Sequence, residues 1–198
     1  MQKAGILHIQ RGFTLVEMMV TIAVLVILAT VAVPGLQEYA VRSGMAAIRD
    51  DFAIALQRAR TDAISRNTCV SMCQLASGST SACAPEAQLG QWHQGWLTYV
   101  NESCSGELPA GGVPALDVIS VRQPGNQRYT LNDNLKSGVV TFDARGSLVS
   151  GAATYGVEDS QDEDSKHARN IVVNKQGRVV VRLVQPSTGG SADSKEGG

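Results

Sequence analysis

The sequence predicts an α+β protein, in which a long N-terminal helix has its C-terminal half packed on an antiparallel β-domain. Three features indicate this fold. An apolar stretch covers residues 13–33, apolar residues at helical spacing follow as far as Ala63, and short strand-like segments separated by turn residues fill the rest. The 198 residues suffice for one such domain and an anchoring helix.

The apolar stretch has the length and composition of a membrane-crossing helix. Its residues that are not apolar are Thr14, Glu17, Thr21 and Thr30. At ~1.5 Å per residue the helix would be roughly 30 Å long, the thickness of a hydrocarbon core. A cleaved secretory signal fits less well, because its apolar region spans about 7–15 residues and precedes the cleavage site. A passive anchor is also disfavoured, since a carboxylate at membrane depth is costly and usually has a partner.

Helical spacing continues beyond Pro34 and Gly35. We expect Pro34 to kink the helix rather than to end it, because the amphipathic pattern resumes at once. The apolar stripe consists of Met45, Ile48, Phe52, Leu56, Ala59 and Ala63. The sequence therefore predicts one helix from about Phe13 to Arg66, with a hydrophobic half at 13–34, an amphipathic half at 35–67 and a stop at Asn67.

Residues 68–185 are predicted to form the β-domain. The expected strands are 68–74, 95–100, 116–121, 139–142, and a hairpin of 170–173 with 178–184. Gly146 and Gly177 are expected to supply turn geometry, and Trp96 and Tyr99 to lie in the β-core or at its rim. The polar, acidic segment 151–168 is predicted to be a solvated loop, because it lacks the spacing of a calcium loop. Residues 186–198 are predicted to be a disordered tail.

The chain has four cysteines, all downstream of the apolar stretch: Cys69, Cys73, Cys83 and Cys104. In an exported domain this even number predicts two disulfides. Cys69 and Cys73 would stand roughly 13 Å apart on an extended strand, too far to bridge each other, so two connectivities remain. Zinc is the alternative, but no second close cysteine pair follows and His93 is not in a recognisable zinc motif. No cofactor is expected.

The segment Arg11-Gly12-Phe13-Thr14-Leu15-Val16-Glu17, with the apolar run behind it, resembles the class III leader of type IV pilins and pseudopilins. Four downstream patches resemble the GspH/FimT group in the same order. They are Arg58-Ala59-x-x-x-Ala63-x-x-Arg66-Asn67-x-x-Val70-x-x-Cys73, Gly95-Trp96-Leu97-Thr98-Tyr99-Val100, Val140-Thr141-Phe142-Asp143-Ala144-Arg145-Gly146, and Arg169-Asn170-Ile171-Val172-Val173 with Gly177-Arg178-Val179. This group contains minor pilins of type IV pili, of FimU and FimT types, and a minor pseudopilin of type II secretion.

The resemblance implies how the N-terminus is processed and used. A prepilin peptidase would remove residues 1–12 by cutting between Gly12 and Phe13, and the new amine of Phe13 would be methylated. Glu17, then the fifth residue, would attract the amine of a neighbouring subunit during assembly. The implied partners are other major and minor pilins, the peptidase and an inner-membrane assembly platform. The implied location is the inner membrane, with a periplasmic C-terminal domain, and then a pilus or pseudopilus.

Three functions follow from the resemblance. The first is a minor pilin that primes a type IV pilus or is incorporated in it, and the others are a DNA-binding minor pilin for natural transformation and a minor pseudopilin. FimT-type members resemble one another in a DNA-contacting Gly-Arg-x-Arg motif, and here the second arginine comes two places late, at Arg182. Arg178 and Arg182 would still share a strand face, with Lys175 at the adjacent turn. Edge protection of a strand is the alternative role for these arginines.

Charge and motif content limit the other functions. The net charge of −1 becomes −3 without residues 1–12, because the leader carries Lys3 and Arg11 and no acidic side chain. We therefore expect no general attraction to nucleic acid, and any contact with double-stranded DNA would be local. Catalysis is not expected, because no nucleophile elbow, phosphate loop or metal-binding histidine pair accompanies His93 and His167.

Overall fold

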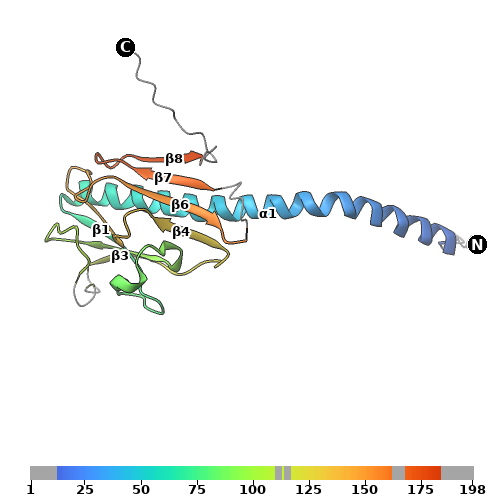
Figure 1. Cartoon of the computed structure of the whole chain (residues 1–198), viewed down its shortest axis with the longest axis horizontal. Helices are drawn as coiled ribbons and strands as arrows, with labels where there is room; N and C mark the ends of the chain where they lie inside the picture. The colour runs from blue at the N-terminus through green and yellow to red at the C-terminus, as the bar shows by residue number, and fades with distance from the viewer. Residues whose placement is uncertain (1–12, 110–112, 114–116, 162–167, 184–198) are drawn as a thin grey trace, which may run out of the picture. The chain divides into compact units, whose positions relative to one another are not determined.

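The computed structural model describes residues 13–109, 113, 117–161 and 168–183. These residues belong to two compact units, Met1–Val41 and Arg42–Gly198, and each is treated by itself. The predicted leader and the predicted disordered tail lie outside the described residues. One helix, α1 (Leu15–Arg66), extends from the first unit into the second, and all the strands belong to the second (Figure 1).

Helix α1 confirms the prediction of a single long helix. It has 52 residues and passes through Pro34 without ending. Its C-terminus closes with two backbone hydrogen bonds, from the amide of Asn67 to Ile64 O (3.3 Å) and from the amide of Thr68 to Ala63 O (3.2 Å). Asn67 has a φ of 51°, in the left-handed region. This pattern is a Schellman motif, in which asparagine takes the place of the usual glycine.

The second unit contains two antiparallel four-stranded sheets. The first sheet has the order β3 (Val118–Arg122), β2 (Trp96–Val100), β1 (Val70–Gln74), β5 (Val139–Phe142). The second sheet has the order β4 (Tyr129–Asp133), β6 (Ala153–Asp159), β7 (Arg169–Val173), β8 (Val179–Leu183). Two short 3-10 helices, η1 (Glu86–Gln88) and η2 (Trp92–Gln94), precede β2. Each of these expected strands is present, with bounds that differ by at most two residues.

The structure has two strands that the sequence analysis does not predict, β4 and β6. Of these, β6 corrects the prediction that residues 151–168 form a solvated loop. Residues 153–159, assigned to a solvated loop, form β6, an inner strand of the second sheet whose Tyr155 and Val157 are fully buried. Apolar residues do alternate along this segment, but Gly156 and Glu158 stand between them and are uncommon in strands, so the pattern does not predict a strand. The buried carboxylate of Asp159 accepts hydrogen bonds from the guanidinium of Arg128 (2.8 Å), so its negative charge is compensated at the end of β6. The other unpredicted strand is β4.

The core of the second unit is organised around Phe52 of α1. Its ring contacts those of Trp92, Trp96 and Tyr155, with centroids 5.3, 5.1 and 4.7 Å away and edge-to-face geometry. Trp96 belongs to β2 and Tyr155 to β6, so one side chain of α1 packs against both sheets. The whole predicted apolar stripe of α1 is buried, including Ala59 and Ala63, whose small side chains let the sheets approach the helix.

Two turns meet at the end of the second unit where α1 finishes. Gly146, with a φ of 78°, follows Asp143 in one turn, and Gly177, with a φ of 75°, closes the turn between β7 and β8. The carbonyl oxygen of Gly146 accepts a hydrogen bond from Arg60 Nε (2.9 Å) and occupies the space that a Cβ on Gly177 would take. The predicted need for glycine at both turns is confirmed. Glycine is required at position 177 for a second reason, because a side chain there would overlap Gly146 O.

Substitution of Gly177 by alanine should therefore destabilise the domain more than the same change at Gly151. Gly151 also has a positive φ (73°), but nothing lies within 4 Å of the position of its missing Cβ. We expect Gly151→Ala to cost about 1 kcal/mol for the left-handed backbone, and Gly177→Ala about 2 kcal/mol more for the overlap with Gly146 O. Urea unfolding of the full chain in detergent, followed by the fluorescence of Trp92 and Trp96, measures both. Equal losses of stability would contradict the packing role of Gly177.

Candidate assembly helix and basic hairpin

The first turn of α1 holds the predicted assembly residue in a capping motif. Thr14 precedes the helix, and its Oγ1 accepts a hydrogen bond from the amide of Glu17 (3.2 Å). Thr14 and Glu17 fit the Thr-x-x-Glu sequence pattern of a capping box, and the structure contains the hydrogen bond to the threonine side chain. Glu17 also lies where the helix dipole favours negative charge. Its side chain is exposed, while Gly12 lies outside the described residues.

The apolar half of α1 is exposed all round in the described chain. Its large apolar side chains between Phe13 and Leu36 have exposed fractions from 47% at Val33 to 78% at Val31. By length and composition α1 qualifies as a membrane-crossing helix, with a mean hydropathy of 2.6 in its most apolar window. Burial of one such side chain is worth about 1.5–3 kcal/mol. This half of the helix therefore has a strong tendency to enter a membrane or to pack on other helices.

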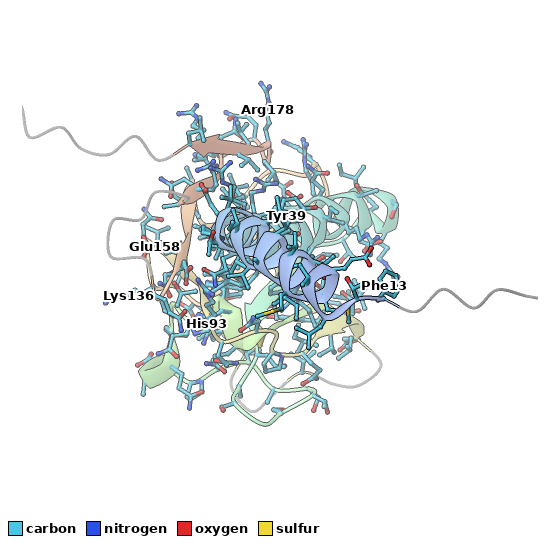
Figure 2. All side chains as sticks on the ribbon, turned by 90° about the vertical axis from the view of Figure 1, so that its right-hand side faces the viewer. Phe13, Tyr39, His93, Lys136, Glu158 and Arg178 are labelled. Atoms are coloured by element: carbon cyan, nitrogen blue, oxygen red, sulfur yellow. A yellow bond between two sulfur atoms is a disulfide. The ribbon has the colours of Figure 1, made fainter. Side chains whose placement is uncertain are left out.

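The hairpin of β7 and β8 carries the predicted DNA-contact residues. Lys175 lies in the turn, Arg178 follows it, and Arg182 lies on β8, and all three are exposed. The strand register pairs Arg182 with Asn170, and the amide of Asn174 donates to Arg178 O, so the two arginines share the outer face of the sheet, as the sequence predicted. Figure 2 shows the Arg178 side chain pointing away from the domain.

Arg169 and the acidic residues of 151–168 are close to this hairpin in the sequence, but the structure does not add the described ones to its basic surface. Arg169 pairs with Leu183 and so belongs to the opposite face, where it does not extend the basic surface. Asp159 is engaged by Arg128, and Figure 2 shows Glu158 well apart from Arg178. Lys166, His167 and the acidic residues at 162–164 lie outside the described residues. The described acidic side chains of 151–168 therefore do not neutralise Arg178.

The two disulfides pair Cys69 with Cys104 and Cys73 with Cys83. This is one of the two connectivities that the sequence left open. Alternation along β1 puts Cys73 on the face that is opposite to the one packed on Phe52, together with Leu97 and Tyr99. The disulfides tie the loops after β1 and β2 to this face. A loop-covered apolar cluster results, which the short strands alone would leave exposed.

An open groove of about 510 Å³ lies between α1 and β3. Its lining includes Asp51, Arg58, Asp62, Trp96 and Arg122. The guanidinium of Arg122 lies 4.6 Å from the Trp96 ring centre and 3.2 Å from Asp51 Oδ2. Acidic and basic groups are thus balanced along the groove, and it has no preference for an anion or a cation.

His93 has a structural environment. Its Nδ1 accepts a long hydrogen bond from the amide of Leu131 (3.4 Å), which joins η2 to the edge strand β4. Partial burial lowers the pKa of His93 below its ordinary value of 6.5. Among residues 13–109, 113, 117–161 and 168–183, no group of three or more His, Cys, Asp or Glu side chains is placed to hold a metal ion.

Two family models match this chain. The model described as type II transport protein GspH matches residues 49–177, and the one described as prokaryotic N-terminal methylation motif matches residues 7–33. A stretch of 38 residues is 50% identical to fimbrial protein EcpC of Eikenella corrodens, covering 19% of this chain and 25% of that protein. The chain thus spans about a quarter of the length of the curated relative that it matches.

Two crystal structures of the type IV minor pilin FimU from Pseudomonas aeruginosa are similar to this one. The P21 form gives a TM-score of 0.54 at 18% identity, over 72% of this chain and 90% of that chain. The P65 form gives 0.49 at 18% identity, over 68% and 89%. The P21 comparison shows a shared fold, a long N-terminal helix followed by antiparallel sheets, and the predicted fold class is confirmed.

The environment of His93 predicts a pH-dependent stability. Because its pKa is lowered in the folded state, the unfolded chain binds a proton at His93 first as the pH falls below about 6.5. The folded state therefore loses stability as the pH falls through this range. His93→Asn, whose amide oxygen can accept the Leu131 hydrogen bond, should flatten this part of the curve.

Urea unfolding of the full chain between pH 8 and pH 5 measures this effect, with pH 8 as the baseline at which both proteins carry a neutral side chain. His93→Asn should match the wild type at pH 8 after a constant offset and then lose less stability on acidification. Parallel curves for the two proteins would show that His93 does not titrate differently on folding.

Proposed function

Because this chain belongs to the family described as type II transport protein GspH and carries the N-terminal methylation motif, we propose that it is a minor subunit of a type IV pilus. A prepilin peptidase cuts between Gly12 and Phe13 and methylates the Phe13 amine. The apolar half of α1 holds the subunit in the inner membrane, with the β-domain on the periplasmic side. The assembly platform then passes it to other major and minor pilins near the pilus tip or initiation complex.

The exposed apolar half of α1 is the observation that carries this proposal. In water its side chains would remain solvated at a high cost, because they have no partner in the described parts of this chain. A membrane covers them before assembly, and neighbouring helices cover them afterwards. The β-domain needs no such cover, since its own core buries Phe52 and the rest of the α1 stripe. One helix thus serves assembly with one half and folding with the other.

Glu17 gives the assembly its register. The Phe13 amine and the Glu17 carboxylate carry opposite charges four positions apart, so a neighbouring amine can be paired when the two helices are correctly offset. The capping hydrogen bond to Thr14 uses the backbone amide of Glu17 and leaves its carboxylate for this pairing.

Glu17→Ala and Glu17→Gln should both leave leader cleavage intact and prevent incorporation into filaments. We expect at least about a tenfold drop in the amount of subunit in sheared pili, since loss of an ion pair at low dielectric exceeds 1.4 kcal/mol. Immunoblots of sheared filaments and membranes measure incorporation, and the mass of the membrane-held chain reports cleavage.

Thr14→Ala is the matched control. It removes the oxygen that caps the Glu17 amide but keeps the Glu17 carboxylate. Filament incorporation should survive this change if Glu17 acts through its charge. Equal loss in Thr14→Ala would assign Glu17 to helix capping, and normal incorporation of Glu17→Ala would overturn its assembly role.

Binding of double-stranded DNA is a second candidate function, favoured by the three exposed cations on one hairpin. Lys175, Arg178 and Arg182 form an exposed basic surface, and Figure 2 shows Glu158 well apart from Arg178. Clustered cations attract phosphates even when the whole protein is slightly acidic.

Alanine at Lys175, Arg178 and Arg182 together should weaken retardation of duplex DNA at low salt by about tenfold or more and reduce its salt dependence. The control is alanine at Lys136, Arg42 and Arg58, which removes one lysine and two arginines from exposed positions outside the hairpin. Retardation that is absent in the wild type, or equally reduced in both variants, would exclude a specific DNA site on the hairpin.

A type II secretion pseudopilus is the other assembly that suits this subunit, because the matched family is described by type II transport. Both assemblies would use α1 and Glu17 in the same way. Co-isolation of the chain with pilus subunits or with secretion pseudopilins distinguishes them.

A further inference from the structure

The two edges of the second sheet differ. At one edge, β4 is covered by η2, through the His93 hydrogen bond to Leu131 and a bridge between Gln91 and Asn132. At the other edge, β8 pairs with β7 on one side only, and no described residue pairs with its outer side. Figure 1 shows β8 at the outer margin of the sheet. An uncovered strand edge is a template for another strand.

The strand register shows which backbone N–H and C=O groups of β8 face away from β7. Asn174 and Arg178 form a hydrogen-bonded pair, and such pairs recur at every second position of an antiparallel ladder. The pairs of Val180 with Val172 and of Arg182 with Asn170 are therefore hydrogen-bonded. The N–H and C=O groups of the intervening residues, Val179, Val181 and Leu183, face away from β7 toward the open edge.

The side chains of β8 divide into two chemically different faces. Val179, Val181 and Leu183 share the inner face with buried Ile171 and Val173, yet Val181 is 41% and Leu183 68% exposed. The outer face carries Arg178 and Arg182 instead. The edge therefore offers apolar contacts on one side and positive charge on the other.

We propose that β8 binds an extended segment of another polypeptide as an additional antiparallel strand, and that this segment alternates apolar and acidic side chains. Its backbone would pair with Val179, Val181 and Leu183, and its apolar side chains would cover the exposed Val181 and Leu183. Its acidic side chains would stand beside Arg178 and Arg182. This mode of recognition obtains affinity from the backbone and specificity from alternate side chains.

Charge complementarity favours this partner over a second copy of the chain. Antiparallel pairing of two β8 strands would bring the arginines of both copies to one outer face without an opposing carboxylate. A duplex DNA would satisfy the arginines, but it would leave the outward N–H groups and the apolar side chains of β8 uncovered.

The test measures binding of a labelled synthetic peptide of alternating valine and glutamate to the full chain in detergent, by fluorescence anisotropy. Val181→Pro removes the outward N–H of β8 without removing a hydrogen bond to β7, since proline is tolerated where the amide faces solvent. We expect peptide binding about tenfold weaker in Val181→Pro. Binding should be unchanged in the control Ile54→Ala, which alters an apolar side chain of α1 that is 45% exposed and lies outside β8. Amide exchange at Val179, Val181 and Leu183 should slow when the peptide binds.

Arg182→Glu supplies the second arm. This variant should bind the valine–glutamate peptide more weakly than the wild type does, and bind a matched valine–lysine peptide more tightly. If Val181→Pro fails to fold, the wild-type chain is tested with a peptide N-methylated on alternate amides, which should bind about tenfold more weakly.

Three results would overturn the proposal. The first is unchanged affinity in Val181→Pro and for the methylated peptide. The second is displacement of the peptide by duplex DNA together with wild-type peptide binding in Val181→Pro, which would show that charge alone accounts for the binding. The third is a dimer of the peptide-free chain that Val181→Pro abolishes, which would assign the edge to a second copy.

Discussion

The insertion of Phe52 among Trp92, Trp96 and Tyr155 is the contact on which the rest of the domain depends. These rings come from α1, η2, β2 and β6, so their packing joins the helix to both sheets at once. Neither four-stranded sheet has a second layer of its own on this side, and aromatic contacts supply a large apolar area from few residues. The two turns at Gly146 and Gly177 then close the domain near the end of α1.

The two halves of α1 differ in how much of their apolar surface is buried. From Met45 to Ala63 a single stripe of the helix is buried and the other faces meet solvent or the groove beside β3. Between Leu15 and Val33 the helix is apolar on almost every side, and its large apolar side chains are exposed. An amphipathic helix is satisfied by its own domain, whereas an apolar helix requires a membrane or neighbouring helices. Family membership and the physical state of α1 therefore point to the same role in assembly.

The sheets show where sequence patterns inform and where they do not. The hairpin of β7 and β8 was predicted because a turn sequence stands between two apolar strands, and its register followed from the turn. β6 was missed because Gly156 and Glu158 occupy its outer face and disguise the buried alternation of Tyr155 and Val157. The Thr14 cap was also overlooked, although the Thr-x-x-Glu pattern marks it.

The sequence by itself determined the properties that depend on near neighbours along the chain. Helix α1, its stop at Asn67, the turn glycines and the shared face of Arg178 and Arg182 all follow from local spacing and backbone preference. Only the tertiary structure decided which cysteines pair, that Asp159 is engaged by Arg128 and Glu158 lies apart from Arg178, and which sheet edge stays open. These are relations between segments distant in sequence, and they are set by how both sheets pack around Phe52.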